Sequence, residues 1–202
     1  MKLFFTPGAC SLAPHIVLRE TGTAFTLEKV DTAKQVTASG ADYRAINAKG
    51  MVPVLELDDG ARLTEGPVIA QFIADQAANT TLMPAAGSMA RYRVMEWQNY
   101  ITSELHKSFA PLFGSELDAT AKGVHAKLLR KKFAWVDGQL ARANYLTGDD
   151  FTVADAYLFV VTGWAKYVGL DLSDLPNLQR FLAAVAARPA VHDAMKAEGL
   201  LG

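Results

Sequence analysis

The only cysteine of this 202-residue chain, Cys10, has the position of a reactive thiol. A short apolar strand over residues 2–6 runs into a Pro-Gly turn, and a helical pattern over residues 11–21 begins directly after Cys10. The start of a helix presents unpaired N–H groups and the positive end of the helix dipole. We therefore expect the pKa of this thiol to lie below its usual ~8.5. A lone cysteine is more often a small buried apolar residue, but its place between a strand and a helix favours a reactive one.

A second candidate group lies on a long helical pattern in the middle of the chain. Asn99, Ser103 and His106 are spaced by four and three residues, so they share one face of that helix. A polar stripe of this kind is most often solvated, and a histidine within it is more often structural than catalytic. The three other histidines lack metal-ligand spacing, and with one cysteine the sequence predicts no zinc or other metal site.

Two segments between these groups have features of a peptide-binding surface. Val52-Pro53 leads into a strand, where ordinary turn chemistry is one interpretation and a cis peptide bond is the other. A cis bond would leave the Val52 backbone exposed to pair with a bound peptide, as an added strand does. Glu65 begins the next helix, and the sequence supports about equally a dipole-capping role and the binding of an amino-acid end.

The elements that must position these residues divide the chain into two halves. The first half mixes strand and helix patterns in the order β-α-β, then β-β-α, which predicts a small sheet with helices on its faces. After a linker over residues 79–87, only helical patterns follow. We therefore predict an α/β domain over 1–78 and an all-helical domain over 88–202. The predicted strands are 2–6, 25–30, 54–57 and 61–63; the predicted helices are 11–21, 33–47 (weak), 65–76, 88–110 (interrupted at Pro111), 119–143 and 152–168, with two short ones flanking Pro189.

One polar pair stands at the start of a nearly all-apolar helix. Thr152 and Asp155 fit a capping box, with aspartate in place of the usual glutamate. A helix that is apolar all round must be buried. We therefore expect Asp155 to satisfy backbone donors in the core and assign it no catalytic role.

Composition limits the possible partners of the chain. The formal net charge is -1 and the pI is about 6.4, so there is no basic field to attract nucleic acid or an anionic membrane. No stretch approaches the ~18 apolar residues that a membrane helix needs. A single cysteine cannot form an internal disulfide, and a reduced, cytoplasmic location is the simplest expectation.

Taken in order, these motifs resemble the cytosolic glutathione transferases and, within them, the bacterial beta class, over the whole chain. The resemblance implies a thioredoxin-like N-terminal domain followed by a helical-bundle C-terminal domain, assembled as a homodimer. It implies glutathione as co-substrate and a hydrophobic electrophile bound against the helical domain. The motifs that carry it are Pro7-Gly8-Ala9-Cys10-Ser11, Val52-Pro53, Thr64-Glu65-Gly66, Asn99 through Glu104-Leu105-His106-Lys107, and Thr152-Val153-Ala154-Asp155-Ala156-Tyr157.

The resemblance also assigns roles by position. Cys10 and His106 would be the catalytic residues at the glutathione sulfur. Val52, before cis-Pro53, would pair with the cysteinyl backbone of glutathione, and Glu65 with Gly66 would hold its γ-glutamyl end. Beta-class proteins commonly have lysine at position 35, and this chain has a glutamine, which can hydrogen-bond the glycine carboxylate but brings no charge. The other residues expected near glutathione, partly from a partner subunit, are Gln35, Asn99, Ser103, Glu104, Leu105 and Lys107.

The function expected from the resemblance is conjugation of the glutathione thiolate to small hydrophobic electrophiles. Thiol–disulfide exchange through Cys10 is a second expected activity, since the two reactions would compete for the same sulfur position. A non-catalytic ligand-binding or regulatory protein on the same fold is the alternative, because a fold alone does not determine function. An isomerase that uses glutathione as cofactor is not excluded by the sequence.

Overall fold

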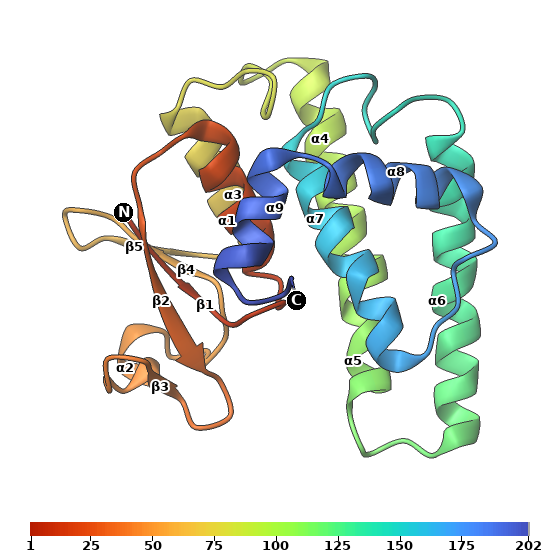
Figure 1. Ribbon diagram of the computed structural model, residues 1–202, viewed down its shortest axis with the longest axis horizontal. Coiled ribbons are helices and arrows are strands. Elements are labelled where there is room, and N and C mark those ends of the chain that lie inside the picture. Colours follow the sequence, from red (N-terminus) through yellow and green to blue (C-terminus); the bar gives the residue numbers. More distant parts are fainter. Residues whose placement is uncertain (202) are drawn as a thin grey trace. The chain divides into compact units, whose positions relative to one another are not determined.

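The computed structural model describes residues 1–201, which form two compact units (Figure 1). One unit comprises Met1–Met83 together with the C-terminal segment from Ala187 onward, and the other comprises Pro84–Ala186. These units differ from the predicted domains 1–78 and 88–202 mainly in the C-terminal segment, whose helix packs against a helix of the first unit. The last residue of the predicted second domain lies outside the described residues.

The first unit contains a mixed five-stranded sheet in the order β3-β2-β1-β4-β5. The central strand β1 runs parallel to β2 and antiparallel to β4, which is the pairing expected when a helix connects β1 to β2. Leu3, Phe4 and Phe5 of β1 are buried, because the sheet is covered and β1 has a neighbour on each side. The strands are β1 (Lys2–Phe5), β2 (Thr26–Asp31), β3 (Val36–Thr37), β4 (Val54–Glu56) and β5 (Arg62–Thr64).

Helix α1 (Leu12–Thr21) is the centre of the helical layer of this unit. It packs against α3 (Gly66–Gln76) and α9 (Pro189–Ala197), and every residue from Leu12 to Leu18 is buried. The helix ends where the sequence predicts, since Gly22 adopts the left-handed conformation with φ of 65° and its N–H donates to the Arg19 carbonyl. This burial fixes the position of the turn that precedes α1.

The prediction of a weak helix over residues 33–47 is wrong. The segment instead forms β3 and the four-residue helix α2 (Tyr43–Ile46). The Asp31 carboxylate accepts from the N–H groups of residues 33 and 34, and Gln35 has a positive φ of 57°, so the chain turns before a helix can form. Asp42 then caps α2 by accepting from the Arg44 N–H. Local side-chain hydrogen bonds therefore outweigh the helix propensity of this alanine-containing stretch.

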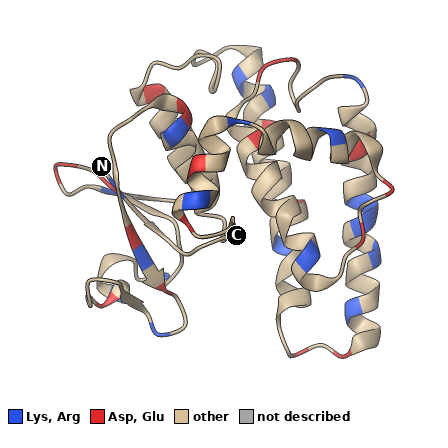
Figure 2. Cartoon of the chain, in the orientation of Figure 1, with Lys and Arg blue, Asp and Glu red and all other residues tan. Residues whose placement is uncertain are grey.

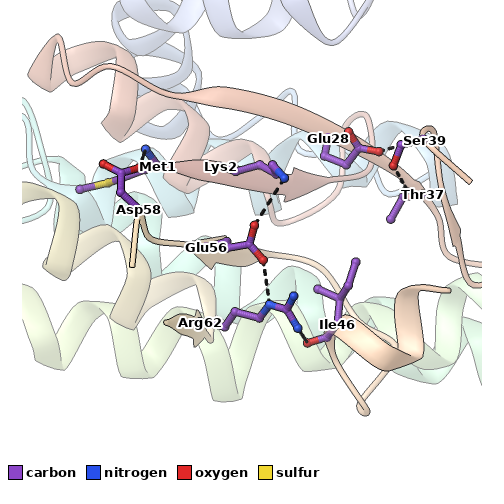
Figure 3. Close-up of polar contacts among 9 residues, drawn as sticks. All are labelled: Met1, Lys2, Glu28, Thr37, Ser39, Ile46, Glu56, Asp58 and Arg62. Atoms are coloured by element: carbon purple, nitrogen blue, oxygen red, sulfur yellow. Dashed lines mark hydrogen bonds and ion pairs between the residues drawn. The ribbon is translucent and has the colours of Figure 1, made fainter. Parts of the chain in front are cut away.

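Charged side chains join neighbouring strands across the sheet surface (Figure 3). Glu56 of β4 lies between its register partners, with Oε1 3.4 Å from Lys2 Nζ of β1 and Oε2 2.9 Å from Arg62 Nε of β5. The hydrogen bond from Arg62 keeps the pKa of Glu56 below its ordinary value. Arg62 also donates to the Ile46 carbonyl at 3.4 Å, and Glu28 accepts from the Ser39 N–H at 2.8 Å. The two cross-strand ion pairs of Glu56 each contribute roughly 0.2–1 kcal/mol to the stability of the sheet.

The second unit is helical, as predicted, with the apolar helix α7 buried at its core. Helix α7 contacts the helical segments α4, η1 and α8, which explains why almost all of its side chains are apolar. The predicted interruption at Pro111 is wrong, because Pro111 lies inside α5 and the irregularity is a π-helical segment just before it. The elements are α4 (Met89–Tyr100), η1 (Ile101–His106, π-helical), α5 (Lys107–Phe113), α6 (Ala119–Leu140), α7 (Val153–Thr162), η2 (Gly163–Val168, 3₁₀) and α8 (Pro176–Ala186).

Basic and acidic residues are interspersed over both units, and several basic residues lie along helix α6 (Figure 2). Two residues of its basic run make specific contacts, since Arg130 pairs with Asp174 and Lys132 pairs with Glu104. Lys127 and Lys131 of the same helix are exposed.

Asp155 forms the buried cap of α7 that the sequence predicts. Its side chain is fully buried; Oδ2 accepts from the N–H of Thr152 at 2.8 Å and from the Thr152 hydroxyl at 2.7 Å. Oδ1 accepts from the Leu146 N–H at 2.9 Å. Burial raises the pKa of Asp155 to about 6, and the three hydrogen bonds oppose that increase. The carboxylate therefore joins the preceding loop to the start of α7.

We predict that Asp155→Ala lowers the free energy of unfolding by at least about 2 kcal/mol, because it leaves three donors of the core without their acceptor. Chemical denaturation measures the loss. Asp150→Ala is the matched control, since Asp150 is exposed in the same loop and its replacement should change stability by less than about 0.5 kcal/mol. Equal stability of the two variants would contradict the capping role.

Candidate functional site

Cys10 lies in the turn between β1 and α1, with its side chain half-buried. Its Sγ is 3.4 Å from the carbonyl oxygen of Val52, so the thiol is directed at the loop that contains Val52-Pro53. The start of α1 offers fewer donors than the sequence argument assumes. The N–H groups of Leu12 and Ala13 donate to the carbonyls of residues 9 and 10, and Pro14 has no N–H.

The turn before the thiol is held by a carboxylate from the far end of the chain. Glu198 Oε2 accepts from the Gly8 N–H at 2.9 Å, and Glu198 Oε1 is 2.9 Å from His15 Nδ1. Both the His15 and the Glu198 side chains are fully buried. Gly8 has φ of +70°, a conformation that favours glycine, so the turn needs this residue as well as its partner. Sequence reasoning missed Glu198, whose partners lie more than 180 residues away.

The loop before β4 is fixed through one carbonyl group. The Val52-Pro53 peptide bond is cis, as the functional interpretation of the sequence expects. The Met51 carbonyl accepts from the Tyr43 hydroxyl at 2.9 Å and from Asn47 Nδ2 at 2.7 Å. Burial raises the pKa of Tyr43 to about 12, so its hydroxyl remains a donor throughout the neutral range. Sequence reasoning missed both donors, because they fall in the segment 33–47, wrongly predicted as a weak helix.

Gln35 connects two loops of the same unit. Its Nε2 donates to the Thr32 carbonyl at 2.5 Å and to the Gly50 carbonyl at 3.0 Å. The Oε1 atom is buried and has no hydrogen-bond partner among the described residues. A Cβ at Gly50 would lie 2.6 Å from this Oε1, so the loops approach closely only because residue 50 is glycine. To contact the glycine carboxylate of a bound ligand, the Gln35 amide would have to break its hydrogen bonds to the Thr32 and Gly50 carbonyls.

Glu65 and Gly66 lie at the start of α3, next to Pro53. Glu65 has a positive φ of 68°, a conformation that costs a non-glycine residue roughly 1–3 kcal/mol and is concentrated at functional sites. Its exposed carboxylate pairs with the Lys49 ammonium at 2.5 Å, and Lys49 also donates to the Thr64 hydroxyl. This carboxylate is therefore placed to bind an ammonium group at the surface. Lys49 is a further residue that sequence reasoning missed.

The register of the sheet brings the Val52 and Glu65 segments together. Val54 of β4 pairs with Thr64 of β5 in antiparallel register. The ladder ends at this pair, because the cis Val52-Pro53 bond precedes β4 and Gly66 already begins α3. A Cβ at Gly66 would lie 3.7 Å from Pro53 Cγ, which confirms the close approach. The Val52-Pro53 segment and the start of α3 are thus neighbours in the first unit.

The other residues predicted for the site lie in or next to the π-helical segment η1 of the second unit. In η1 and the first turn of α5, side-chain hydroxyls donate to carbonyls four residues earlier, from Ser103 to Asn99 at 3.1 Å and from Ser108 to Glu104 at 2.6 Å. Lys132 Nζ donates to the same Glu104 carbonyl at 3.0 Å. These bonds compete with the regular backbone ladder in the stretch where the helix is π-helical. The single face expected for residues 99, 103 and 106 assumed uniform α-helical geometry, which the π segment does not have.

The predicted residues of this helix differ in exposure. Asn99, Ser103 and Lys107 are exposed, whereas the Leu105 side chain is fully buried in the core. The Glu104 carboxylate lies 2.9 Å from Lys132 Nζ, and the hydrogen bond from Lys132 keeps the pKa of Glu104 below its ordinary value. Leu105 is therefore placed to support the helix, and only its backbone is available to a ligand.

His106 is half-buried in an aromatic setting. Its Nδ1 is 2.6 Å from the Tyr157 hydroxyl, and its ring packs edge-on against Trp164 with ring centroids 4.7 Å apart. Tyr157 belongs to the α7 motif that the sequence analysis treats as structural. The contact joins η1 to α7.

Two properties of the described part of the chain complete the picture. Among residues 1–201, no helix combines the length and apolar character needed to cross a bilayer. Within the same residues, no three His, Cys, Asp or Glu side chains are grouped so as to hold a metal ion.

Two protein-family models match the chain. The model described as "Glutathione S-transferase, N-terminal domain" matches residues 8–76, and the one described as "Glutathione S-transferase, C-terminal domain" matches residues 99–184. Together they cover most of both units.

Individual proteins are similar to the chain over its full length. Glutathione S-transferase GstA of Escherichia coli O157:H7 is 48% identical over 200 residues, which is 99% of this chain and 100% of GstA. A sphingomonad glutathione S-transferase solved in complex with glutathione matches with a TM-score of 0.95 at 47% identity, covering 99% of this chain and 100% of that chain. A bacterial beta-class glutathione S-transferase of Sphingomonas chungbukensis matches with a TM-score of 0.95 at 45% identity, covering 100% of both chains.

Removal of the buried carboxylate tests its hold on the thiol turn. Glu198→Ala should lower the free energy of unfolding by about 2–5 kcal/mol, because Gly8 and His15 lose a buried partner. Glu198→Gln should lose less, since its amide oxygen still accepts one hydrogen bond. Lys196→Ala, at an exposed position of α9, is the control for helix effects in urea denaturation. The role is refuted if Glu198→Ala and Lys196→Ala unfold at the same urea concentration.

Proposed function

Since the chain belongs to the glutathione S-transferase family and, within it, to the bacterial beta class, we propose that it conjugates glutathione to small hydrophobic electrophiles. In this reaction the glutathione thiolate attacks an electrophilic carbon, a carbon–sulfur bond forms and the leaving group departs with the bonding electrons. Because a protonated thiol is a poor nucleophile, the site must favour the thiolate.

One observation carries the proposal. The Cys10 thiol faces the Val52 carbonyl, and Pro53, the next residue, lies against Gly66 at the start of α3. An extended peptide paired with Val52 would have one end at the Glu65 carboxylate. Glutathione suits this surface, because its γ-glutamyl end carries an ammonium and a carboxylate. Glu65 would accept from the ammonium, and the Gly66 N–H would donate to the carboxylate.

Cys10 and His106 have the catalytic roles in this proposal. Cys10 would face the glutathione sulfur, and His106 would stabilise the thiolate by donating a hydrogen bond. With glutathione disulfide, the Cys10 thiolate would instead attack one sulfur, form a mixed disulfide and release one glutathione thiolate. Gln35 would support the glycine end through the loops it joins. Residues proposed to complete the site are Asn99, Ser103, Glu104, Leu105 through its backbone, and Lys107.

We also propose that the protein acts as a cytoplasmic homodimer, in which Asn99, Ser103 and Glu104 partly serve the partner's site. Met89, Tyr92 and Met95 are exposed and follow one another at three-residue spacing along one face of α4. Exposed apolar residues that gather on one face typically mark an interaction surface. Because the same helix leads into η1, a dimer through this face would bring the η1 residues near the partner.

The alternative function, a non-catalytic ligand-binding or regulatory protein on the same fold, would be favoured by weak glutathione binding, and some contacts within the chain compete with glutathione. The amide of Gln35 donates to two carbonyls, the Glu65 carboxylate holds Lys49, and the Cys10 thiol faces the Val52 carbonyl. Glutathione would have to displace some of these contacts, which lowers affinity.

Turnover of a chromogenic aryl halide with glutathione distinguishes the two functions. We expect the wild-type protein to form the thioether at a rate proportional to enzyme concentration. Cys10→Ala should form no mixed disulfide with glutathione disulfide, since the chain has no other cysteine, and should retain part of the conjugation rate. Mass spectrometry detects the adduct. Glutathione binding without turnover of a broad electrophile panel would favour the non-catalytic alternative.

Glu65→Gln should raise the KM for glutathione by about tenfold or more, because the ligand ammonium loses a charged acceptor. The thermal melting temperature should change little, since the exposed Lys49–Glu65 pair contributes only about 0–1 kcal/mol. Glu96→Gln, which removes a similarly exposed pair with Arg93, is the matched control. If both variants keep the wild-type KM, Glu65 does not bind the γ-glutamyl end.

A further inference from the structure

We propose that Tyr157 is a positioning residue for His106, whose imidazole it holds in the tautomer that carries its proton on Nε2. The inference rests on the proposed function, since the tautomer matters for catalysis only if His106 stabilises a thiolate. From the sequence, the motif that contains Tyr157 has a role in folding alone. The structure joins that motif to His106 through a side-chain contact across 51 residues of sequence.

The contact has the geometry of a strong hydrogen bond. The Tyr157 hydroxyl lies 2.6 Å from His106 Nδ1, at the short end of the normal range. Tyr157 is only 4% exposed, so water competes little for its hydroxyl. Its ring and the imidazole lie edge to face with centroids 5.9 Å apart, and the Trp164 ring contacts the imidazole edge-on. These aromatic contacts restrict rotation of the imidazole about its side-chain bonds.

The direction of the hydrogen bond follows from relative acidity. A phenol has a pKa of ~10 and is protonated at neutral pH, whereas a neutral imidazole N–H is a much weaker acid. The O–H group is therefore the better donor, and the unprotonated nitrogen is the better acceptor. When Tyr157 donates to Nδ1, the proton of the neutral imidazole must reside on Nε2.

This tautomer serves thiolate stabilisation. An Nε2–H group donates a hydrogen bond to an anionic sulfur, while an unprotonated Nε2 would present a lone pair to it. A fixed donor also spares the reorganisation that a rotating imidazole would need during the reaction. Tyr157 thus acts through His106 and has no need to touch the substrate.

The support for Tyr157 extends to the start of its helix. Asp155 caps α7 two residues before Tyr157, and its carboxylate also binds the preceding loop at Leu146. Helix α7 contacts η1, which ends with His106. The buried cap therefore fixes the backbone from which the hydroxyl reaches the imidazole. Tyr157 forms the connection between the structural motif of α7 and the proposed chemistry of η1.

Nitrogen-15 NMR of histidine-labelled full-length protein at neutral pH reads the tautomer directly, and His106→Gln identifies the His106 signals. In the wild type we expect His106 to show a protonated Nε2 and an unprotonated Nδ1. Tyr157→Phe should convert this pattern to a mixture of tautomers, and the exposed Tyr167→Phe should leave it as in the wild type. A wild-type His106 protonated on Nδ1 overturns the proposal without any variant, as does an unchanged pattern in folded Tyr157→Phe.

Kinetics with glutathione and an aryl halide give the second measurement. Tyr157→Phe should lower kcat about tenfold, the effect of one lost hydrogen bond, with the KM for glutathione within about twofold of wild type. A raised KM with unchanged kcat would overturn the positioning role. If the wild type shows the expected tautomer but no turnover, the proposed function fails while the assignment of the hydrogen bond stands.

Discussion

The thiol end of the site depends most on the two contacts of the buried Glu198 carboxylate. It accepts from the Gly8 backbone two residues before Cys10 and pairs with His15 one turn into α1, so it holds the turn from both sides. A buried carboxylate is costly unless its oxygens are satisfied, and these two partners satisfy it. The C-terminal helix α9 must therefore pack on α1, and the end of the chain belongs to the unit that begins it.

The same principle organises the rest of the site. The Met51 carbonyl is held by Tyr43 and Asn47 before the chain turns at cis-Pro53, and Gln35 joins the loop at Thr32 to the loop at Gly50. In the second unit, Asp155 caps the helix that carries Tyr157, which in turn contacts His106. In each case a hydrogen-bonded polar side chain fixes a backbone segment, and that segment presents a residue with proposed chemistry.

The sequence predicted what local patterns determine. The strand–turn–helix around Cys10, the end of α1 at Gly22 and the cap at Asp155 follow from residues within a few positions of one another. The sequence also indicated the right class of fold, because the order of strands and helices is a local property. The prediction of a helix over 33–47 was wrong because an Asx turn at Asp31 interrupts the helix. Such a turn leaves no trace in the periodicity of the sequence.

Residues with distant partners could not be predicted. Glu198, Tyr43 and Lys49 look like ordinary members of their segments, and their roles appear only when the fold brings their partners to them. The π-helical turn before Lys107 likewise has a distant partner, since Lys132 of another helix donates to its Glu104 carbonyl. Leu105, assigned to the site by resemblance, has its side chain in the core.

The most direct measurement of the central claim is a map of backbone amide chemical shifts during titration of the protein with S-methylglutathione, which cannot react. The account predicts saturable shifts concentrated at residues 8–11, 50–53 and 64–68, where the thiol turn, the Val52 loop and the start of α3 meet the ligand. Shifts confined to α8 and the 141–151 loop, or no saturable shifts at all, would contradict it.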